Sequence, residues 1–296
     1  MSDFDLAEQL NNEGMLLRNG GDIAGAEAAY RAASAAAPEW SAPVYNLGLL
    51  YKYEGRWRES LVCYQHAVIL APDDGDSWWN LGIAATALGD WIEARRAWTS
   101  CGIEVPPGEG PPEFNWGHTP IRLDPNGQAE VVWARRLDPA RAQIVSVPLP
   151  SSPFHWGDIV LTDGAVEGQR MVDGRTYSVF NALQLLAPSG FRTFVVELAA
   201  VQPNALAAFE DCATNHGGAA EDWGTFTSIL CAECSRGFPH EHAPGTSASA
   251  HPHWGLAARD HDHANEIVSQ WLANTPGADL DVWYEAPPTL PNDYCN

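Results

Sequence analysis

Lysine is nearly missing from this sequence: Lys52 is the only lysine among 16 basic residues, which face 38 acidic residues. The resulting formal net charge of −22 repels phosphate backbones, so it excludes nucleic-acid binding through charge. A basic protein partner would instead be attracted to such a surface. The same excess of acid also keeps a protein soluble, and the sequence alone leaves both roles open.

The sequence also has no long apolar run and few cysteines for its length. No stretch approaches the roughly 18 to 20 apolar residues that span a bilayer. The first residues, MSDFDLAEQLNNEG, lack the basic-then-apolar pattern of a secretion signal, so we expect a cytoplasmic protein. Six cysteines in 296 residues make no disulfide framework, and close cysteine pairs then indicate metal or redox chemistry.

Familiar catalytic motifs are also absent from the sequence. It contains no glycine-rich phosphate loop, no Gly-x-Ser-x-Gly turn and no His-Glu-x-x-His helix. An enzyme is therefore not indicated by any motif, and a binding function is favoured.

What the sequence does contain is a repeat with a period of 34 residues. Four kinds of residue recur in phase through three copies, which chance does not explain. These columns are the glycines Gly14, Gly48 and Gly82, the small residues Ala26, Ser60 and Ala94, the aromatics Tyr30, Tyr64 and Trp98, and the prolines Pro38, Pro72 and Pro106.

The columns have the chemistry of stacked helical hairpins. Small residues allow two antiparallel helices to approach closely, aromatic residues fill the space between hairpins, and proline ends each second helix. Glycine between the helices suits the left-handed turn at a helix end. The predicted first helices are Leu6–Asn19, Ala42–Tyr53 and Asp76–Leu88, and their partners are Ile23–Ala36, Trp57–Leu70 and Trp91–Ile103.

On these columns, residues 1–105 resemble the tetratricopeptide repeat, with its Gly, Ala, aromatic and Pro pattern present in all three copies. The resemblance implies an all-α superhelix whose concave face, lined by the first helices, binds a protein or peptide. It places seven residues on that face: Asn11, Met15, Tyr45, Leu49, Tyr53, Trp79 and Ile83.

The predicted concave face is largely apolar. Family members that bind chaperone tails grip a carboxylate with Lys, Asn and Arg, whereas Tyr45 and Trp79 occupy the corresponding faces here. We therefore expect aromatic or aliphatic anchors from a partner. The alternative is that the protein's own C-terminal half covers this face.

After a Pro- and Gly-rich linker, predicted over residues 106–127, the pattern changes to short β-like runs. We expect a small β-barrel-like subdomain over 128–190 and an α+β, ferredoxin-like subdomain over 191–296; one continuous domain is the alternative. Asp163-Gly164 and Asp173-Gly174 are hairpin-turn signals. The predicted strands are Val131–Ala134, Ala142–Pro148, Asp158–Leu161, Gln169–Val172, Phe191–Ala199, Ala220–Phe226 and Asp281–Glu285, and the predicted helices are Asn204–Thr214 and His261–Asn274.

One cluster in the C-terminal part has the chemistry of a metal site. Cys231 and Cys234 are followed closely by His240 and His242, which supplies the four thiolate and imidazole ligands that tetrahedral zinc prefers. The gap between the pairs is short for a zinc module, and two packed thiols or a redox pair are the alternatives.

Two further His-x-His pairs, His251/His253 and His261/His263, suggest a second function. Together with neighbouring carboxylates they could form a metal-dependent hydrolase whose substrate the repeats recruit. Histidines beside a loop such as residues 243–250 are more often simply solvated. The sequence therefore favours an adaptor that binds a protein, in one version an immunity-like inhibitor of a basic toxin, and keeps the hydrolase as the alternative.

The zinc hypothesis is tested by elemental analysis of protein purified without a histidine tag. We expect close to one zinc per chain, lost in Cys231→Ser and retained in Cys63→Ser, because only the former removes a predicted ligand. Affinity should fall as pH drops, since protons compete for the thiolates. Metal-free protein of unchanged stability would contradict the site.

Overall fold

The computed structural model describes residues 2–114, 116–125, 130–172, 174–198, 203–223 and 253–287. Its contacts divide the chain into two compact units. The first comprises the described residues up to Phe114 together with Leu137–Ala140, and the second comprises the described parts of 115–136 and 141–294.

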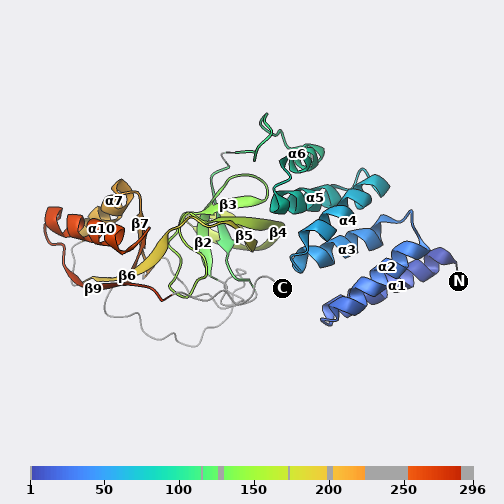
Figure 1. The fold of residues 1–296 in the computed structure, drawn as a ribbon, viewed down its shortest axis with the longest axis horizontal. Coiled ribbons are helices and arrows are strands. Elements are labelled where there is room, and N and C mark those ends of the chain that lie inside the picture. The colour runs from blue at the N-terminus through green and yellow to red at the C-terminus, as the bar shows by residue number, and fades with distance from the viewer. Residues whose placement is uncertain are drawn as a thin grey trace. The chain divides into compact units, whose positions relative to one another are not determined.

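The first unit is a series of helical hairpins (Figure 1). All six predicted helices are confirmed to within three residues at each end, because helix starts and stops follow strong local signals. Asp22 and Asp90 cap second helices by accepting hydrogen bonds from Gly25 N at 2.9 Å and Glu93 N at 3.1 Å. The helices are α1 Asp3–Asn19, α2 Ile23–Ala36, α3 Ser41–Tyr53, α4 Trp57–Leu70, α5 Gly75–Leu88 and α6 Trp91–Ser100.

The last helix of the series is shorter than expected. It ends at Ser100 rather than Ile103, well before Pro106. Gly102 has a φ of +78°, which no helix interior contains, so the chain leaves the helix before the proline is reached.

The glycine column is explained by the aromatic column. A Cβ placed on Gly14 would lie 2.6 Å from the ring of Tyr30, which belongs to the second helix of the same hairpin. The equivalent distance is 3.0 Å from Gly48 to Tyr64. From Gly82 to the ring of Trp98 it is 2.4 Å. Each ring therefore occupies the space of the missing side chain, and any larger residue must displace it.

The ring of the first hairpin also joins it to its neighbour. Tyr30 is fully buried in a cluster with Leu47, Leu50 and Tyr51 of the next hairpin. This confirms the expected role of the aromatic column between hairpins.

The second unit begins with a barrel. Its five strands close on themselves, with β1 and β5 pairing in parallel at Ile121 and Phe180. Alternate residues such as Val132 and Ala134 point into a core that also buries Phe154. The strands are β1 His118–Arg122, β2 Val131–Arg136, β3 Arg141–Ile144, β4 Ile159–Val172 and β5 Arg175–Ala187.

The strand predictions for the barrel need three corrections. Two predicted strands, Asp158–Leu161 and Gln169–Val172, are parts of the single strand β4. Asp163-Gly164 is no hairpin turn, because the pairing with β5 continues past it with shifts of register at this point. The strand predicted over Ala142–Pro148 ends at Ile144.

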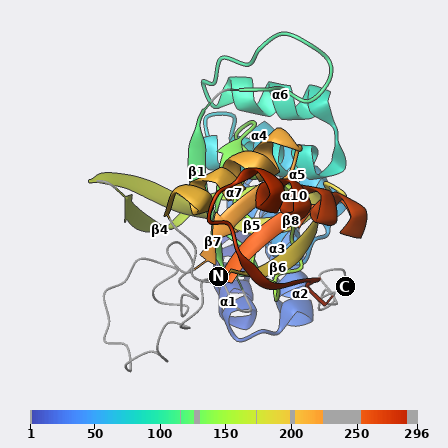
Figure 2. The same ribbon diagram turned by 90° about the vertical axis from the view of Figure 1, so that its left-hand side faces the viewer.

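Two barrel strands were not anticipated from sequence. β1 lies inside the segment predicted as a linker. The sequence did not indicate this strand because Pro120 stands at its centre, and proline is unusual within a strand. β5 was not predicted at all. It pairs with the long strand β4, and the two form a hairpin whose far end projects beyond the other strands (Figure 2).

The remaining strands form a separate antiparallel sheet in the order β7-β8-β6-β9. The prediction of a strand-rich α+β region with two groups of strands is confirmed, and β8 is the strand that the sequence did not reveal. Two helices cover one face of this sheet (Figure 1). The elements are β6 Arg192–Leu198, α7 Pro203–Asn215, β7 Ala219–Asp222, β8 His253–Ala258, α10 His261–Asn274 and β9 Leu280–Glu285.

The opposite faces of the sheet have different cores. Phe209, Trp254 and Trp271 fill the space between the sheet and its helices. On the other face, Val195 and Trp223 pack with Val147, which comes from the segment between β3 and β4. That segment therefore joins barrel and sheet within one unit. None of the described helices is long and apolar enough to cross a membrane.

The contact between glycine and the aromatic ring predicts a large effect of a single methyl group. Gly82→Ala should lower the free energy of unfolding by about 1–3 kcal/mol, because Trp98 is fully buried and cannot move aside. Thermal unfolding measures the change. The control is Gly75→Ala, at a helical glycine with open space around it, which should unfold like the parent. Equal loss in both variants would contradict this packing.

Candidate functional site

The first helices of the three hairpins are linked side by side through polar side chains. Asn46 on α3 donates from Nδ2 to Oδ1 of Asn11 on α1, at 2.9 Å. Asn80 on α5 donates to the hydroxyl of Tyr45 on α3, at 3.4 Å, and accepts from Nζ of Lys52 at 2.9 Å. These bonds join α1, α3 and α5 side by side, and we call the face formed by these first helices the first-helix surface.

The structure places the seven predicted partner-binding residues at different depths. Met15 and Tyr53 are exposed, by 39% and 57%. Tyr45, Leu49 and Trp79 are half-buried. Asn11 and Ile83 are buried, Ile83 completely. The most accessible members are therefore Met15 and Tyr53, while the role of all seven in partner binding stays a prediction.

Two of the half-buried aromatics are held by the repeat itself. Tyr45 packs edge-on against Tyr64, with ring centroids 5.7 Å apart, and Trp79 packs the same way against Trp98 at 5.3 Å. Both pairs have the same spacing in their repeats, so the columns that build the hairpins also orient these first-helix residues.

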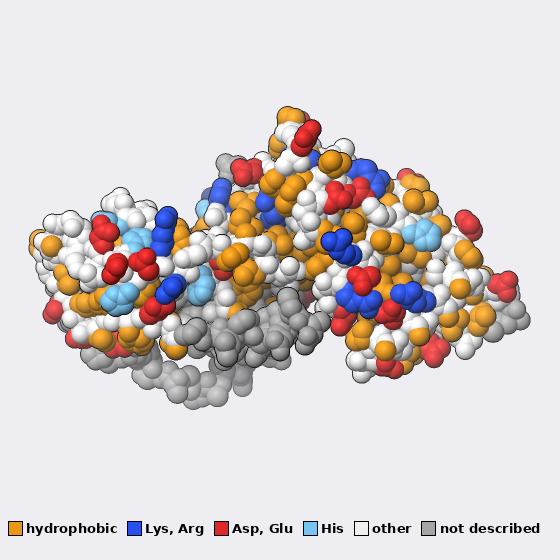
Figure 3. Space-filling view, viewed as in Figure 1, with side chains coloured by type: hydrophobic (Ala, Val, Ile, Leu, Met, Phe, Trp, Pro, Cys, Tyr) orange, Lys and Arg blue, Asp and Glu red, His pale blue; other side chains and the backbone are white. Residues whose placement is uncertain are grey.

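A cluster of charges ties the first two hairpins together. Glu27 on α2 accepts from Nη1 of Arg56 at 2.7 Å, from Arg31 and from the hydroxyl of Tyr51 on α3. Burial raises the pKa of Glu27, but the hydrogen bonds from Tyr51, Arg56 and Arg31 outweigh burial and lower it below the ordinary value. Acidic and basic side chains lie beside one another on the repeats (Figure 3). These bonds tie α2 to α3 and to Arg56 at the start of α4.

The predicted zinc ligands Cys231, Cys234, His240 and His242 lie outside the described residues. Within the described ranges, no group of three or more His, Cys, Asp or Glu side chains could hold a metal ion. The zinc site therefore stays a prediction.

The described histidines of the second unit make structural contacts. His263 accepts a hydrogen bond from Arg259 N at Nδ1, and its Nε2 lies 2.9 Å from the carbonyl oxygen of His216, so it carries the proton there. The ring of His261 packs on Trp283. These interactions connect the ends of α7, α10 and β9.

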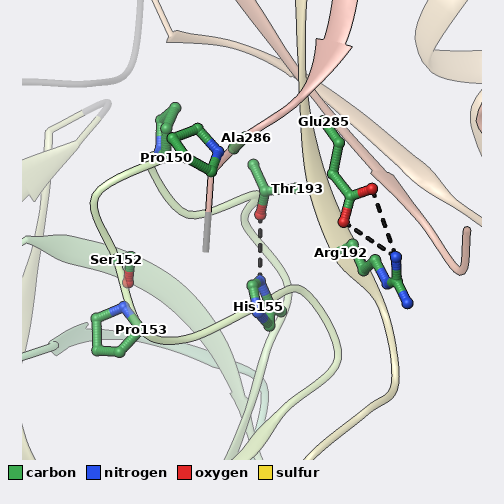
Figure 4. Close-up of a pocket in the computed structure, with 9 residues that line it drawn as sticks. Pro150, Ser152, Pro153, His155, Arg192, Thr193, Glu285 and Ala286 are labelled. Carbon is green, nitrogen blue, oxygen red and sulfur yellow. Dashed lines mark hydrogen bonds and ion pairs between the residues drawn. The ribbon is translucent and has the colours of Figure 1, made fainter. Parts of the chain in front are cut away.

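A pocket of about 380 Å³ opens in the second unit (Figure 4). Three segments far apart in sequence line it: residues 150–155 before β4, residues 192–193 of β6 and residues 285–287 at the end of β9. Arg192 and Glu285 lie on one side of it and Ser152 and Pro153 on the other, with His155 and Thr193 between them (Figure 4).

Buried carboxylates fix the segment that forms one wall of this pocket. Glu130 accepts a hydrogen bond from Leu149 N at 2.9 Å, and Glu221 accepts one from Val147 N at 2.5 Å. The other oxygen of Glu130 is buried and makes no hydrogen bond to any described residue. Burial raises the pKa of Glu130 to about 7, opposed by the Leu149 amide and reinforced by the charge of Glu221.

Sequence reasoning did not single out His155, Thr193, Glu130 or Glu221. Each stands in its own segment without a motif, and only the fold brings the segments together. No local signal in the sequence could have identified them.

The raised pKa of Glu130 predicts a stability that depends on pH. Between pH 4.5 and about 7, a carboxyl group with this raised pKa is protonated in the folded state and ionised in the unfolded chain. Its contribution to the free energy of unfolding therefore falls as pH rises through that window. Glu130→Gln should therefore be more stable than the parent at pH 8, by up to about 3 kcal/mol, but not at pH 4.5. Denaturant unfolding at both pH values measures the difference. An exposed control, Glu266→Gln in α10, should show no such dependence; an equal gain at both pH values would refute ionisation of the buried carboxyl group as the cause.

Comparison with known proteins finds a family match within the first unit. The family model of the tetratricopeptide repeat matches residues 45–99. No curated protein matches the chain.

Similar solved structures include the second repeat domain of Spaghetti (RPAP3) bound to an HSP90 peptide, with 20% identity over 32% of this chain and 89% of that chain at a TM-score of 0.31. The TPR2B domain of yeast Sti1 in complex with pHsp70 is 19% identical over 32% of this chain and 76% of its own, at a TM-score of 0.31. A mutant O-GlcNAc transferase of Thermobaculum terrenum is 23% identical over 34% of this chain and 19% of its own, at a TM-score of 0.32. The family match lies on the second and third hairpins, where the glycine and aromatic columns recur, and these two hairpins are tetratricopeptide repeats.

Proposed function

We propose that this protein is an adaptor that binds a partner protein or peptide through the first-helix surface. One observation supports the proposal: Met15 and Tyr53 are exposed, and each lies beside a side chain that links the first helices, Asn11 and Lys52 respectively. Met15 contacts Asn11 through its sulfur, and the ring of Tyr53 lies 5.1 Å from Nζ of Lys52, which bonds to Asn80.

The side chains of this surface suit an extended or helical peptide with apolar anchors. An exposed tyrosine offers a rigid ring and a hydroxyl, and an exposed methionine adapts to irregular apolar shapes. The amides of Asn46 and Asn80 are held in place by their own hydrogen bonds. The proposal is thus a surface with two exposed contact points, Met15 and Tyr53, on helices whose linking amides are ordered.

The charge of the chain favours a basic partner. With a net charge of −22, long-range attraction raises the rate at which a cationic protein arrives. In its narrowest form, the proposal is an immunity-like inhibitor that neutralises a basic protein. Binding should then weaken as ionic strength rises.

The experiment starts with capture from an extract of the source cells and identification of the retained protein. Affinity is then measured by calorimetry between the purified partner and each variant. Tyr53→Ala and Met15→Ala should weaken binding about tenfold or more, because large anchor side chains dominate interface energies. Val62→Ala is the matched control, an exposed apolar residue on α4, a second helix, and should leave the affinity unchanged.

The opposite pattern would contradict the proposal. If Val62→Ala weakened binding while Tyr53→Ala and Met15→Ala did not, the partner would contact the second helices. Thermal unfolding of each variant confirms that the change in affinity is not a loss of fold.

A further inference from the structure

The pocket of the second unit is preformed. The carboxylate of Asp158, itself buried, accepts hydrogen bonds from His155 N at 2.8 Å and from Ser189 N at 2.7 Å. Next to His155, Phe154 is anchored in the barrel core. The wall that carries His155 is therefore held from both sides, and a ligand would not have to order it.

Two hydrogen-bond donors of this pocket are oriented and still available. Arg192 meets both oxygens of Glu285 with the same nitrogen, Nη1, at 3.1 and 3.4 Å. Its Nε–Nη2 edge has no partner among the described residues, and this edge matches the two oxygens of a carboxylate. Nδ1 of His155 lies 3.3 Å from the hydroxyl of Thr193; in the tautomer in which Nδ1 accepts from this hydroxyl, Nε2 carries the proton and can donate to a ligand.

The remaining lining selects for an apolar body. Pro150, Pro153 and Pro287 present rigid, largely apolar rings. A volume of about 380 Å³ is at the lower end of the range for small-molecule sites, where apolar walls and a few placed polar groups are usual. Because Glu285 is already paired with Arg192, an anion can enter without meeting an unbalanced negative charge.

We propose that this pocket binds a small organic carboxylate. The carboxylate lies against the Nε–Nη2 edge of Arg192 and within reach of Nε2 of His155, and the apolar part of the ligand packs on the proline rings. Glu285 acts as a positioning residue that holds the guanidinium group. This site is independent of partner binding by the repeats, because all of its residues belong to the second unit.

Calorimetric titration of the full chain with benzoate tests the proposal, with benzamide as a neutral ligand of the same shape. Benzoate should bind with one site per chain and benzamide about tenfold more weakly or worse, because only benzoate makes charge-assisted hydrogen bonds. Arg192→Gln should weaken benzoate binding by a similar factor and leave benzamide unaffected. Glu285→Gln should weaken benzoate binding less than Arg192→Gln does, because the amide oxygen of Gln can still accept a hydrogen bond from Nη1 of Arg192.

The control variant is Arg175→Gln, an exposed arginine at the start of β5 that does not line the pocket. It should bind benzoate like the parent, and thermal unfolding should show that all variants are folded. Three results would overturn the proposal: no binding of benzoate at millimolar concentration, equal binding of benzoate and benzamide, or an equal loss in Arg175→Gln and Arg192→Gln. Each of these leaves the adaptor function of the repeats untouched.

Discussion

The structure of the repeats depends on one contact, an aromatic ring lying directly on a glycine of the facing helix. In the third hairpin, Gly82 and Trp98 approach so closely that a single added carbon would lie 2.4 Å from the indole ring. The contact fixes the distance between the two helices, and in the first hairpin the ring of Tyr30 also packs against the next hairpin. Repeating it every 34 residues therefore fixes both the hairpins and their stacking. The orientation of the first helices, and with it the surface proposed to bind a partner, follows from this packing.

The two units reach stability by different means. The repeats bury small and aromatic residues, and their charges, such as those around Glu27, form pairs at the surface. In the second unit, Glu130 and Glu221 are buried against backbone amides of a single segment, and no cation is among the causes of their raised pKa values. Burying a carboxyl group costs free energy unless it stays protonated. The same segment continues into residues 150–155, which line the pocket.

The repeats could be predicted from the sequence because every constraint in them is local and recurs. Gly48 and Tyr64 stand in the same hairpin, and their spacing appears three times. The barrel was harder: Pro120 disguises β1, and the register shifts around Asp163 give a continuous strand the pattern of a turn. The pocket could not be predicted from the sequence for another reason. His155 and Glu285 are far apart in the chain, and only the order of the strands in the fold brings both into the lining of the pocket.

The central claim, that the surface formed by α1, α3 and α5 binds a partner, is tested most directly by site-specific photo-cross-linking. A photoreactive amino acid at position 53 probes that surface, and the same group at position 62 probes the second helices; both side chains are exposed. Irradiation of the complex with the captured partner should produce a covalent product from position 53 and none from position 62. A product from position 62 alone would contradict the claim and assign binding to the opposite side of the hairpins.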